Sequence, residues 1–250
     1  MPRYYPIQLN LEDQTCLVVG GGAVAARKVG GLLEAGARVR VVSLRLTPEL
    51  QAKAEAGEIE ARIASYAPEH LDGVVLAFAA TDDRRVNAQV AADAGARGIP
   101  VNVADSPEES RFLVPSVVRR GELCLSVSTG GHSPMLAARL CDELEARFGP
   151  EYADFVELLG QMRSYIKERT EDVSRRRAAL ARLVAAEAEL LAALRAGPPE
   201  AARARAAALI EEALKPSLCP SPEEGVKAAA STLTPGPSPF KGEGRTRAHS

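Results

Sequence analysis

Short apolar runs alternate with helical patterns over the first part of the chain, up to about residue 111. The run Val74–Ala80 is apolar at every position, which is typical of a strand buried on both faces of a sheet. Helical patterns at 23–34 and 86–97 lie between such runs. Strands that alternate with helices indicate an α/β fold with a parallel sheet. The apolar and β-branched runs predict strands at 15–19, 38–43, 59–64, 74–80 and 100–104.

The pattern changes after residue 111. Two apolar runs, 112–118 and 123–128, flank the polar segment Arg119–Glu122 and predict a β-hairpin. A helix is expected to begin at Ser133-Pro134, because serine is favoured as an N-cap residue and proline at the first helical position.

The remainder of the chain falls into a helical part and a polar tail. The pattern is helical from 151 to about 214, with 16 alanines among the 37 residues from 178 to 214 and an interruption at Gly197-Pro198-Pro199. The last 35 residues hold 6 prolines, 4 glycines, 5 serines and only four large apolar side chains, so we expect them to be disordered. The predicted parts are an α/β domain at 1–111, a hairpin and helix at 112–150, a helical domain at 151–215 and a disordered tail at 216–250.

Charge and cysteine content exclude several classes of protein. The 31 Lys and Arg residues nearly balance the 33 Asp and Glu residues, so nothing favours a nucleic-acid partner. The longest apolar run is far shorter than the ~20 residues of a membrane span, and the N-terminus lacks the apolar stretch of a signal peptide. The four cysteines are scattered, which predicts no disulfide framework, no resident metal site and a cytoplasmic location.

A glycine-rich motif follows the first predicted strand. The segment Gly20–Ala25 fits the pattern G-x-G-x-x-A and leads into the first predicted helix. In a dinucleotide-binding turn, Gly20 would permit the tight bend, Gly22 would let a pyrophosphate approach, and amides near Ala23 and Val24 would face it. A glycine turn without a ligand is the alternative, but this context favours a nucleotide site in a Rossmann-like domain.

The end of the second predicted strand departs from the usual pattern. Rossmann-like domains that bind NAD usually carry an acidic residue there, which binds the ribose hydroxyls. This chain has Ser43, Leu44 and Arg45 instead. Because Arg45 is also suited to contact a 2′-phosphate, the residues alone leave the choice between NAD and NADP open.

Carboxylates follow two other predicted strands, at the edge of the sheet where ligands bind in open α/β folds. Asp105 ends the segment Asn102–Asp105 and is suited to be a general base or a transient metal ligand. A turn-capping role is an equally good interpretation, because Asp-Ser-Pro is common in turns. After Thr81, a helix cap is the slightly favoured role for Asp82.

The segment Ser126–Pro134 is rich in hydroxyl groups and precedes a predicted helix. Its hydroxyl groups and free amides suit the recognition of carboxylates or phosphates. His132 alone is more typical of an ordinary loop residue, and its distance in sequence from Asp105 does not establish a catalytic pair. Ser128 lies outside a G-x-S-x-G context, which argues against a hydrolase nucleophile.

Several of these motifs, taken together and in order, resemble the N-terminal region of the siroheme synthase family. That family comprises precorrin-2 dehydrogenases, some of which also act as sirohydrochlorin ferrochelatases. The resemblance covers about residues 3–170. The segments that carry it are Tyr5–Leu9, Cys16–Lys28, Ala79–Asp83, Asn102–Asp105, Phe112–Ser116 and Val127–Pro134.

The resemblance implies a set of roles. It implies an NAD cofactor held by Gly20, Gly22, Ala23, Val24, Ser43, Leu44, Arg45, Thr81 and Asp82. It implies Asp105 as the catalytic base, with Ser128, Gly130 and His132 on the substrate side. The substrates would be precorrin-2 and sirohydrochlorin, with Fe2+ as a transient partner. In this family the hairpin and the next helix form a homodimer interface with exchanged elements, and the helices after Gly149 help to enclose the tetrapyrrole.

The substrate's carboxylates would require cations, for which the candidates are Lys28, Arg111, Arg119 and Arg120. Two other functions are compatible with parts of the sequence. An NAD-binding redox sensor would retain the glycine motif and need no catalytic carboxylate. A short-chain oxidoreductase would need a Tyr-x-x-x-Lys pair after the fourth strand, and that pair is missing from the sequence there.

Overall fold

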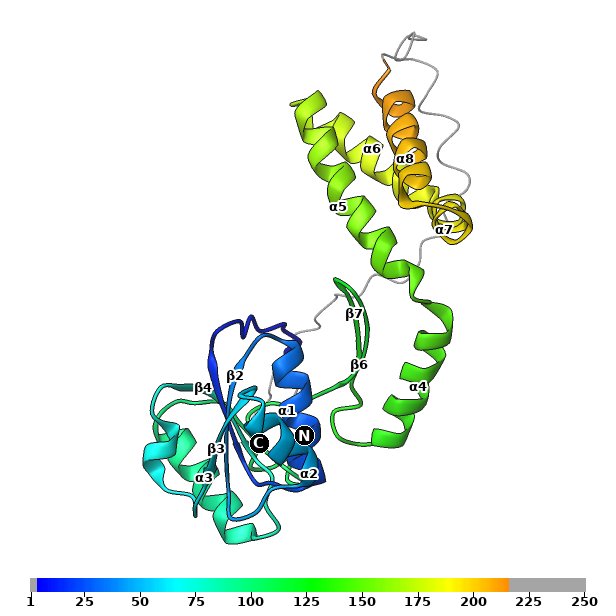
Figure 1. Cartoon of the computed structure of the whole chain (residues 1–250). Helices are drawn as coiled ribbons and strands as arrows, with labels where there is room; N and C mark the ends of the chain where they lie inside the picture. Colours follow the sequence, from blue (N-terminus) through cyan, green and yellow to red (C-terminus); the bar gives the residue numbers. More distant parts are fainter. Residues whose placement is uncertain (1–3, 216–250) are drawn as a thin grey trace, which may run out of the picture. The chain divides into compact units, whose positions relative to one another are not determined.

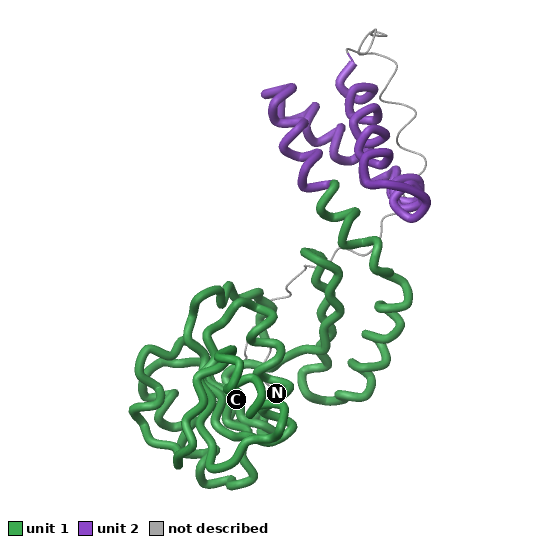
Figure 2. The backbone as a smooth tube through the Cα atoms, viewed as in Figure 1, with its two compact units in different colours: residues 1–158 green, residues 159–250 purple. Residues whose placement is uncertain are grey.

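The computed structural model describes residues 4–215, and the predicted tail at 216–250 lies outside them. The chain divides into two compact units, Met1–Leu158 and Leu159–Ser250 (Figure 2). None of the described helices is both long enough and apolar enough to cross a membrane.

A parallel sheet forms the centre of the first unit. Its order is β3-β2-β1-β4-β5, so the chain reverses direction across the sheet between β1 and β4. In open α/β folds this reversal point is where ligands bind, at the carboxyl ends of the strands. The strands are β1 (Thr15–Val19), β2 (Arg38–Ser43), β3 (Ile59–Ile63), β4 (Val74–Ala79) and β5 (Val101–Val103).

Helices cover both faces of this sheet (Figure 1). One face packs against α1 (Ala23–Glu34) and α2 (Pro48–Glu55), and the other against η1 (Pro68–Leu71) and α3 (Arg84–Ala96). In β1, Cys16 and Val18 enter the first core, whereas Leu17 and Val19 enter the second. Successive side chains point to opposite faces, so a strand covered on both sides must be apolar throughout.

The structure confirms the Rossmann-like α/β fold and its five predicted strands. It adds two elements that the apolar pattern did not predict, α2 and η1. Both are short: α2 buries only Leu50, and η1 buries His70 and Leu71. Helices with so few buried positions give a weak periodic signal.

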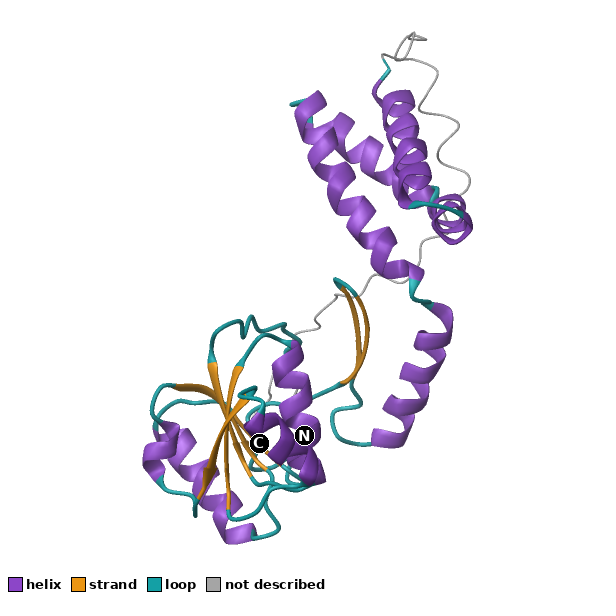
Figure 3. Ribbon diagram, viewed as in Figure 1, coloured by secondary structure: helices purple, strands orange, loops and turns teal. Residues whose placement is uncertain are grey.

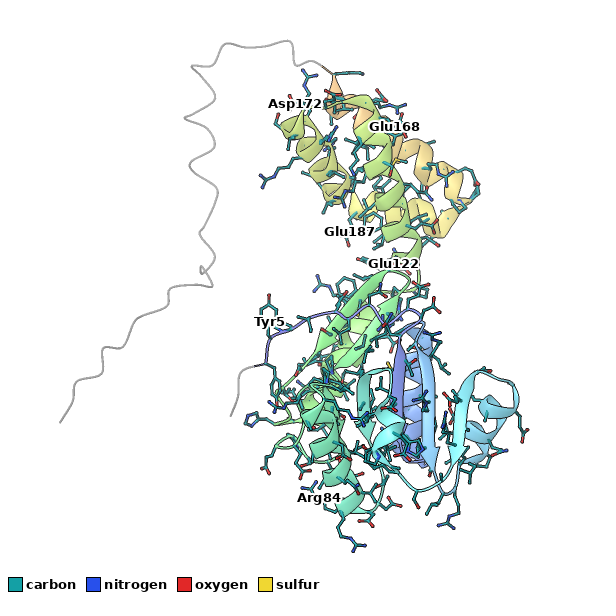
Figure 4. All side chains as sticks on the ribbon, turned by 90° about the vertical axis from the view of Figure 1, so that its left-hand side faces the viewer. Tyr5, Arg84, Glu122, Glu168, Asp172 and Glu187 are labelled. Atoms are coloured by element: carbon teal, nitrogen blue, oxygen red, sulfur yellow. The ribbon has the colours of Figure 1, made fainter. Side chains whose placement is uncertain are left out.

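The predicted hairpin is present, but its turn is shorter than expected. The strands are β6 (Ser116–Arg120) and β7 (Leu123–Val127), so Arg119 and Arg120 belong to the strand and pair with Cys124 and Leu123. The turn itself is Gly121-Glu122, with a φ of +56° at Gly121, a backbone conformation that glycine adopts readily. Glu122 marks the tip of the hairpin in Figure 4.

Helix α4 (Pro134–Arg147) lies along the hairpin (Figure 1) and begins as the sequence predicts. The side chain of Ser133 accepts a hydrogen bond from the amide of Leu136, and Pro134 occupies the first turn. At its other end, Arg120 Nε donates to the carbonyl of Phe148 at 2.9 Å. The hairpin is therefore fastened to the end of α4.

Helices form the described part of the second unit (Figure 3). They are α5 (Glu151–Arg169), which begins in the first unit, α6 (Val173–Ala185), α7 (Glu187–Ala196) and α8 (Pro199–Leu214). The expectation of one continuous helical pattern before Gly197 is wrong, because the chain also breaks before α6 and at Ala186. Asp172 caps α6 by accepting from the amides of Ser174 and Arg175. Asp172 is labelled in Figure 4.

The alanines explain the packing of these helices. Ala179 of α6 and Ala202 and Ala206 of α8 are fully buried. Small side chains allow neighbouring helices to approach closely while larger residues such as Leu183 and Ile210, also fully buried, fill the remaining space.

Candidate active site

The glycine turn after β1 is constrained by the backbone of the neighbouring strand. Gly20 has a φ of +126°, and a Cβ atom there would lie 2.2 Å from the carbonyl oxygen of Ala80. Only glycine satisfies both conditions. The turn is thereby held against the end of β4, beside the point where the sheet reverses.

Gly22 has the opposite environment. It is the N-cap residue of α1, and a Cβ atom built there would meet no atom within 4 Å. No side chain caps this helix, and its first turn holds no acidic residue. The amides of that turn, around Ala23 and Val24, are suited to bind an anion, which the helix dipole also favours. These residues fit the pyrophosphate of a dinucleotide.

The remaining glycine, Gly21, occupies a variable position of the G-x-G-x-x-A pattern, and in the structure it joins two turns. A Cβ atom there would lie 2.0 Å from the carbonyl oxygen of Arg45. The carbonyl oxygen of Gly21 accepts a 2.9 Å hydrogen bond from the amide of Thr47. The turn after β2 is therefore packed against the glycine turn and hydrogen-bonded to it.

These turns line a cavity of about 600 Å³, a volume typical of small-molecule sites. Tyr66 and Val86 contribute apolar surface to it, which suits a nucleotide base. Ala23 and Val24 are not in its lining. The predicted cofactor residues that do line it are Gly20, Gly22, Ser43, Leu44, Arg45, Thr81 and Asp82.

Ser43 stands where a ribose-binding acid is usual, and its hydroxyl group is used locally. It donates to the carbonyl oxygen of Arg45 at 2.8 Å and accepts from the amide of Arg45 at 3.4 Å. The side chain of Arg45 is exposed and lines the cavity. The cavity therefore has a cation, and no carboxylate, at the end of β2.

A buried amide shapes the turn after β4, and it lies outside every motif in the sequence. Asn87 on α3 is only 4% exposed. Its Oδ1 accepts from the amide of Thr81 at 3.1 Å, and its Nδ2 donates to the carbonyl oxygen of Thr81 at 2.9 Å. A buried polar side chain bonded to both backbone groups of one residue fixes that residue's conformation. In the sequence, only the six-residue spacing between Thr81 and Asn87 relates these two residues.

The expectation that Asp82 caps the next helix is wrong. Asp83 is the N-cap residue of α3, and its side chain accepts from the amide of Arg85 at 2.8 Å. This bond and the Arg85 guanidinium, 3.3 Å away, lower the pKa of the Asp83 carboxyl group. Asp82 is exposed and lines the cavity.

Tyr66 lines the cavity as a neutral phenol. Its hydroxyl group donates to Asp93 at 3.1 Å, and burial together with this carboxylate raises its pKa. Burial likewise raises the pKa of the Cys16 thiol to about 11, so this core cysteine is unreactive near neutral pH.

Asp105 lies directly after β5, at the same edge of the sheet but outside the cavity lining. The amide of Ala104 donates to Ala79 at 2.8 Å, which holds the turn beside the end of β4. Asp105 is exposed and has a φ of +58°, which is uncommon for a residue other than glycine. Such backbone conformations concentrate at functional sites.

The loop that holds the predicted substrate residues lies beside the Asp105 turn. A Cβ atom on Gly131 would lie 3.8 Å from Cγ of Pro107. Within the loop, Ser128 Oγ accepts from the amide of Gly130 at 3.2 Å, and His132 is exposed. Gly130 and Gly131 have φ values of +63° and +86°. The fold thus brings together the two segments to which the family resemblance assigns catalysis and substrate binding.

Two of the candidate cations have structural partners. Arg120 bonds to the end of α4, as described above, and to Glu145 at 3.1 Å. Lys28 lies 5.7 Å from the ring centre of Phe78, and burial and the neighbouring Arg27 lower its pKa. Arg111 and Arg119 are exposed. Among residues 4–215, no group of three or more His, Cys, Asp or Glu side chains is arranged to hold a metal ion.

Known proteins resemble this chain in both sequence and fold. Residues 7–116 match a family described as putative NAD(P)-binding. The siroheme synthase of Chromobacterium violaceum is 46% identical over 175 residues, which cover 70% of this chain and 37% of that protein. Siroheme synthase 1 of Aeromonas salmonicida is 42% identical over 184 residues, which cover 74% and 39%.

A solved structure extends the likeness beyond the sheet. SirC, a precorrin-2 dehydrogenase, is 26% identical, with a TM-score of 0.62 over 84% of this chain and 100% of its own. The chain spans only 37% to 39% of the two curated siroheme synthases, but the whole of SirC. The described fold contains the NAD(P)-binding domain that the glycine motif predicts. The chain is therefore similar, over most of its length, to siroheme synthases in sequence and to a precorrin-2 dehydrogenase in fold.

Proposed function

We propose that the chain is an NAD+-dependent dehydrogenase that oxidises precorrin-2 to sirohydrochlorin. One observation carries this proposal: a solved precorrin-2 dehydrogenase matches 84% of the chain and is itself covered completely. The similarity to siroheme synthases and the dinucleotide-shaped turn at Gly20–Gly22 support it.

Each turn of the proposed cofactor site would bind a different part of the dinucleotide. The open space above Gly22 and the uncapped amides of α1 would bind the pyrophosphate. Ser43–Arg45 and the turn from Thr81 to Asp82 would border the adenosine and ribose groups. We propose NAD+ as the preferred cofactor, with NADP+ bound more weakly, following the family.

Oxidation of precorrin-2 removes a hydride and a proton from the macrocycle. NAD+, when bound, supplies the hydride acceptor. Asp105 takes the proton as the general base, since its carboxylate is exposed at the cofactor edge of the sheet. The same segment carries Pro107, which lies beside the loop assigned to the substrate side.

The substrate side is the loop beside Pro107. Precorrin-2 carries eight carboxylates, and the hydroxyl groups and amides of Ser128, Gly130 and His132 would bind some of them. Arg111 and Arg119, which are exposed, are the cations best suited to bind others.

The name of the relatives, siroheme synthase, favours a second activity, a lyase-type step that inserts Fe2+ into sirohydrochlorin. That step requires a base to remove the pyrrole protons, and we assign it to Asp105 as well. Iron is a substrate in this proposal, and no described residue is assigned as a resident metal ligand.

We further propose that the protein works as a homodimer in the cytoplasm. A two-stranded hairpin is marginally stable alone, and α4 packs on this one. Val114, Val117 and Met135 of this segment are 47%, 39% and 86% exposed. A second copy would cover these apolar side chains. The cytoplasm would keep the free thiols of Cys16, Cys124 and Cys141 reduced.

The decisive experiment is an anaerobic assay with precorrin-2 and NAD+, following NADH and sirohydrochlorin by absorbance. We expect turnover by the wild type and, for Asp105→Asn, a loss of about 10²–10⁴-fold in kcat with unchanged affinity for NAD+. Asp13→Asn is a matched control, because Asp13 also has a positive φ, +57°, but precedes β1 at the opposite edge of the sheet. A protein that binds NAD+ without turnover would instead be a redox-sensing module.

A further inference from the structure

The turn that carries Asp105 is closed by a hydroxyl group outside every motif in the sequence. Ser110 lies five residues after Asp105, and the chain between them folds back on the edge strand β5. The amide of Val103 donates to Ser110 Oγ at 2.9 Å. Ser110 Oγ in turn donates to the carbonyl oxygen of Ser106 at 2.8 Å, with that of Val103 at 3.3 Å. One hydroxyl group thus joins both ends of the segment that contains Asp105.

The bonds of Ser110 replace those that a further strand would supply. Strand β5 is the last in the sheet, so one side of its backbone has no neighbouring strand. The amide of Arg111 donates to Val101 at 2.8 Å, and Asn102 Nδ2 donates to Phe112 at 3.0 Å. The bond from the Val103 amide to Ser110 Oγ continues this row of hydrogen bonds along β5, and it lies two residues before Asp105.

The closed segment forces Asp105 into its unusual backbone conformation. The amide of Ser106 donates to the carbonyl oxygen of Val103 at 3.2 Å, so residues 103–106 form a tight turn. Asp105 is the third residue of that turn, with a φ of +58°. Glycine and asparagine are favoured at such a position. Ser106 is only 5% exposed, so the turn is anchored in the protein at the residue after Asp105.

We propose that Ser110 is the positioning residue for Asp105, fixing the turn so that the carboxylate is held in the orientation that catalysis requires. The inference rests on the proposed role of Asp105 as the base. It assigns Ser110 no contact with the substrate or with NAD+. An ion pair of 2.9 Å between Glu109 and Arg84, at the beginning of α3, also holds the segment. Arg84 is labelled in Figure 4.

The test compares variants of Ser110 in the precorrin-2 assay. We expect Ser110→Ala to lower kcat about tenfold while the KM for NAD+ changes less than twofold. Ser110→Thr retains a hydroxyl group and should recover most of the rate. Ser110→Val has nearly the shape of threonine without the hydroxyl group, and should be as slow as Ser110→Ala. Gln89→Ala, at an exposed position on α3, is the control for a polar side chain outside the turn.

A double-mutant cycle separates positioning from general destabilisation. In an Asp105→Asn background, Ser110→Ala should change the residual rate less than twofold, because no base remains to be positioned. A merely structural Ser110 would lower both backgrounds equally. Hydrogen exchange of the Val103 amide should be faster in Ser110→Ala than in the wild type, which reports the loss of the bond directly.

The outcomes distinguish the two proposals. If the wild type does not turn over, or Asp105→Asn retains its rate, the proposed function of Asp105 is wrong. If Asp105→Asn is inactive but Ser110→Ala retains the wild-type kcat, the role of Ser110 is overturned. If Ser110→Ala does not fold, the threonine and valine variants decide, and equal rates for these two would overturn the proposal.

Discussion

The turns after β1, β2 and β4 line the cofactor cavity, and we call them the cofactor turns. They lie at the same edge of the sheet as the segment after β5 that carries Asp105, the Asp105 segment, yet the two regions are built differently. Backbone packing and a buried side chain fix the cofactor turns: there is no room for a Cβ atom at Gly20 or Gly21, and Asn87 is buried. The Asp105 segment has an exposed carboxylate on a residue with a positive φ, and it is held by the hydroxyl group of Ser110, which is hydrogen-bonded to the edge strand β5. A cofactor common to many reactions suits a rigid site, whereas the reacting group must face an open substrate side.

The largest effect on NAD+ binding is expected at the glycine turn, which is one of the cofactor turns. Gly22→Val should weaken NAD+ binding by about 100-fold, roughly 2.7 kcal/mol, because its side chain would fill the space assigned to the pyrophosphate. The melting temperature should change little, since no protein atom lies within 4 Å of that Cβ position. Calorimetric titration with NAD+ measures the effect.

Gly20→Ala is the contrasting variant. Its Cβ atom would lie 2.2 Å from Ala80, so this substitution should lower the melting temperature of the protein as well as its affinity for NAD+. Equal NAD+ affinity in Gly22→Val and the wild type would show that the dinucleotide does not approach α1 at this point.

The cofactor turns and the Asp105 segment also differ in how far the sequence predicts them. The glycine motif, the strand before it and helix 23–34 follow from apolar periodicity and from the steric demands of a tight turn. These are local properties of the chain. The roles of Asn87 and Ser110 depend on hydrogen bonds across six and seven residues of folded backbone, which no periodicity encodes.

The errors have the same physical origin. The sequence favours Asp82 as a cap because both it and Asp83 precede a helix, and only the position at which α3 begins decides between them. The break at Ala186 lies in an alanine-rich segment without proline or glycine, so it reflects packing between helices rather than local preference. Local chemistry predicts elements, and tertiary contacts decide their ends.

A moderate effect on NAD+ binding is expected at Asn87, the buried amide that holds the turn after β4. Asn87→Asp would leave the carbonyl oxygen of Thr81 without its donor and place a carboxylate at a site only 4% exposed. We expect about tenfold weaker binding of NAD+ and a lower melting temperature. Gln89→Glu makes the equivalent change at an exposed position of the same helix and should alter neither. Unchanged NAD+ affinity in Asn87→Asp would show that the Thr81 turn tolerates movement.

The smallest effect concerns the choice of cofactor at the end of β2. Arg45 lines the cavity where an acidic residue is usual, so its charge favours a 2′-phosphate, even though the family implies NAD+. Arg45→Glu should therefore weaken NADP+ several-fold by repulsion while NAD+ binds as well as before or better, because a carboxylate can accept hydrogen bonds from the ribose hydroxyls. Arg38→Glu reverses the same charge at the opposite end of the strand, and screening there should leave the ratio of the two dissociation constants unchanged. Titrations with both nucleotides at low and high salt measure that ratio. If Arg45→Glu leaves this ratio unaltered, the selectivity of the cofactor site for NAD+ or NADP+ comes from the shape of its backbone rather than from the charge of residue 45.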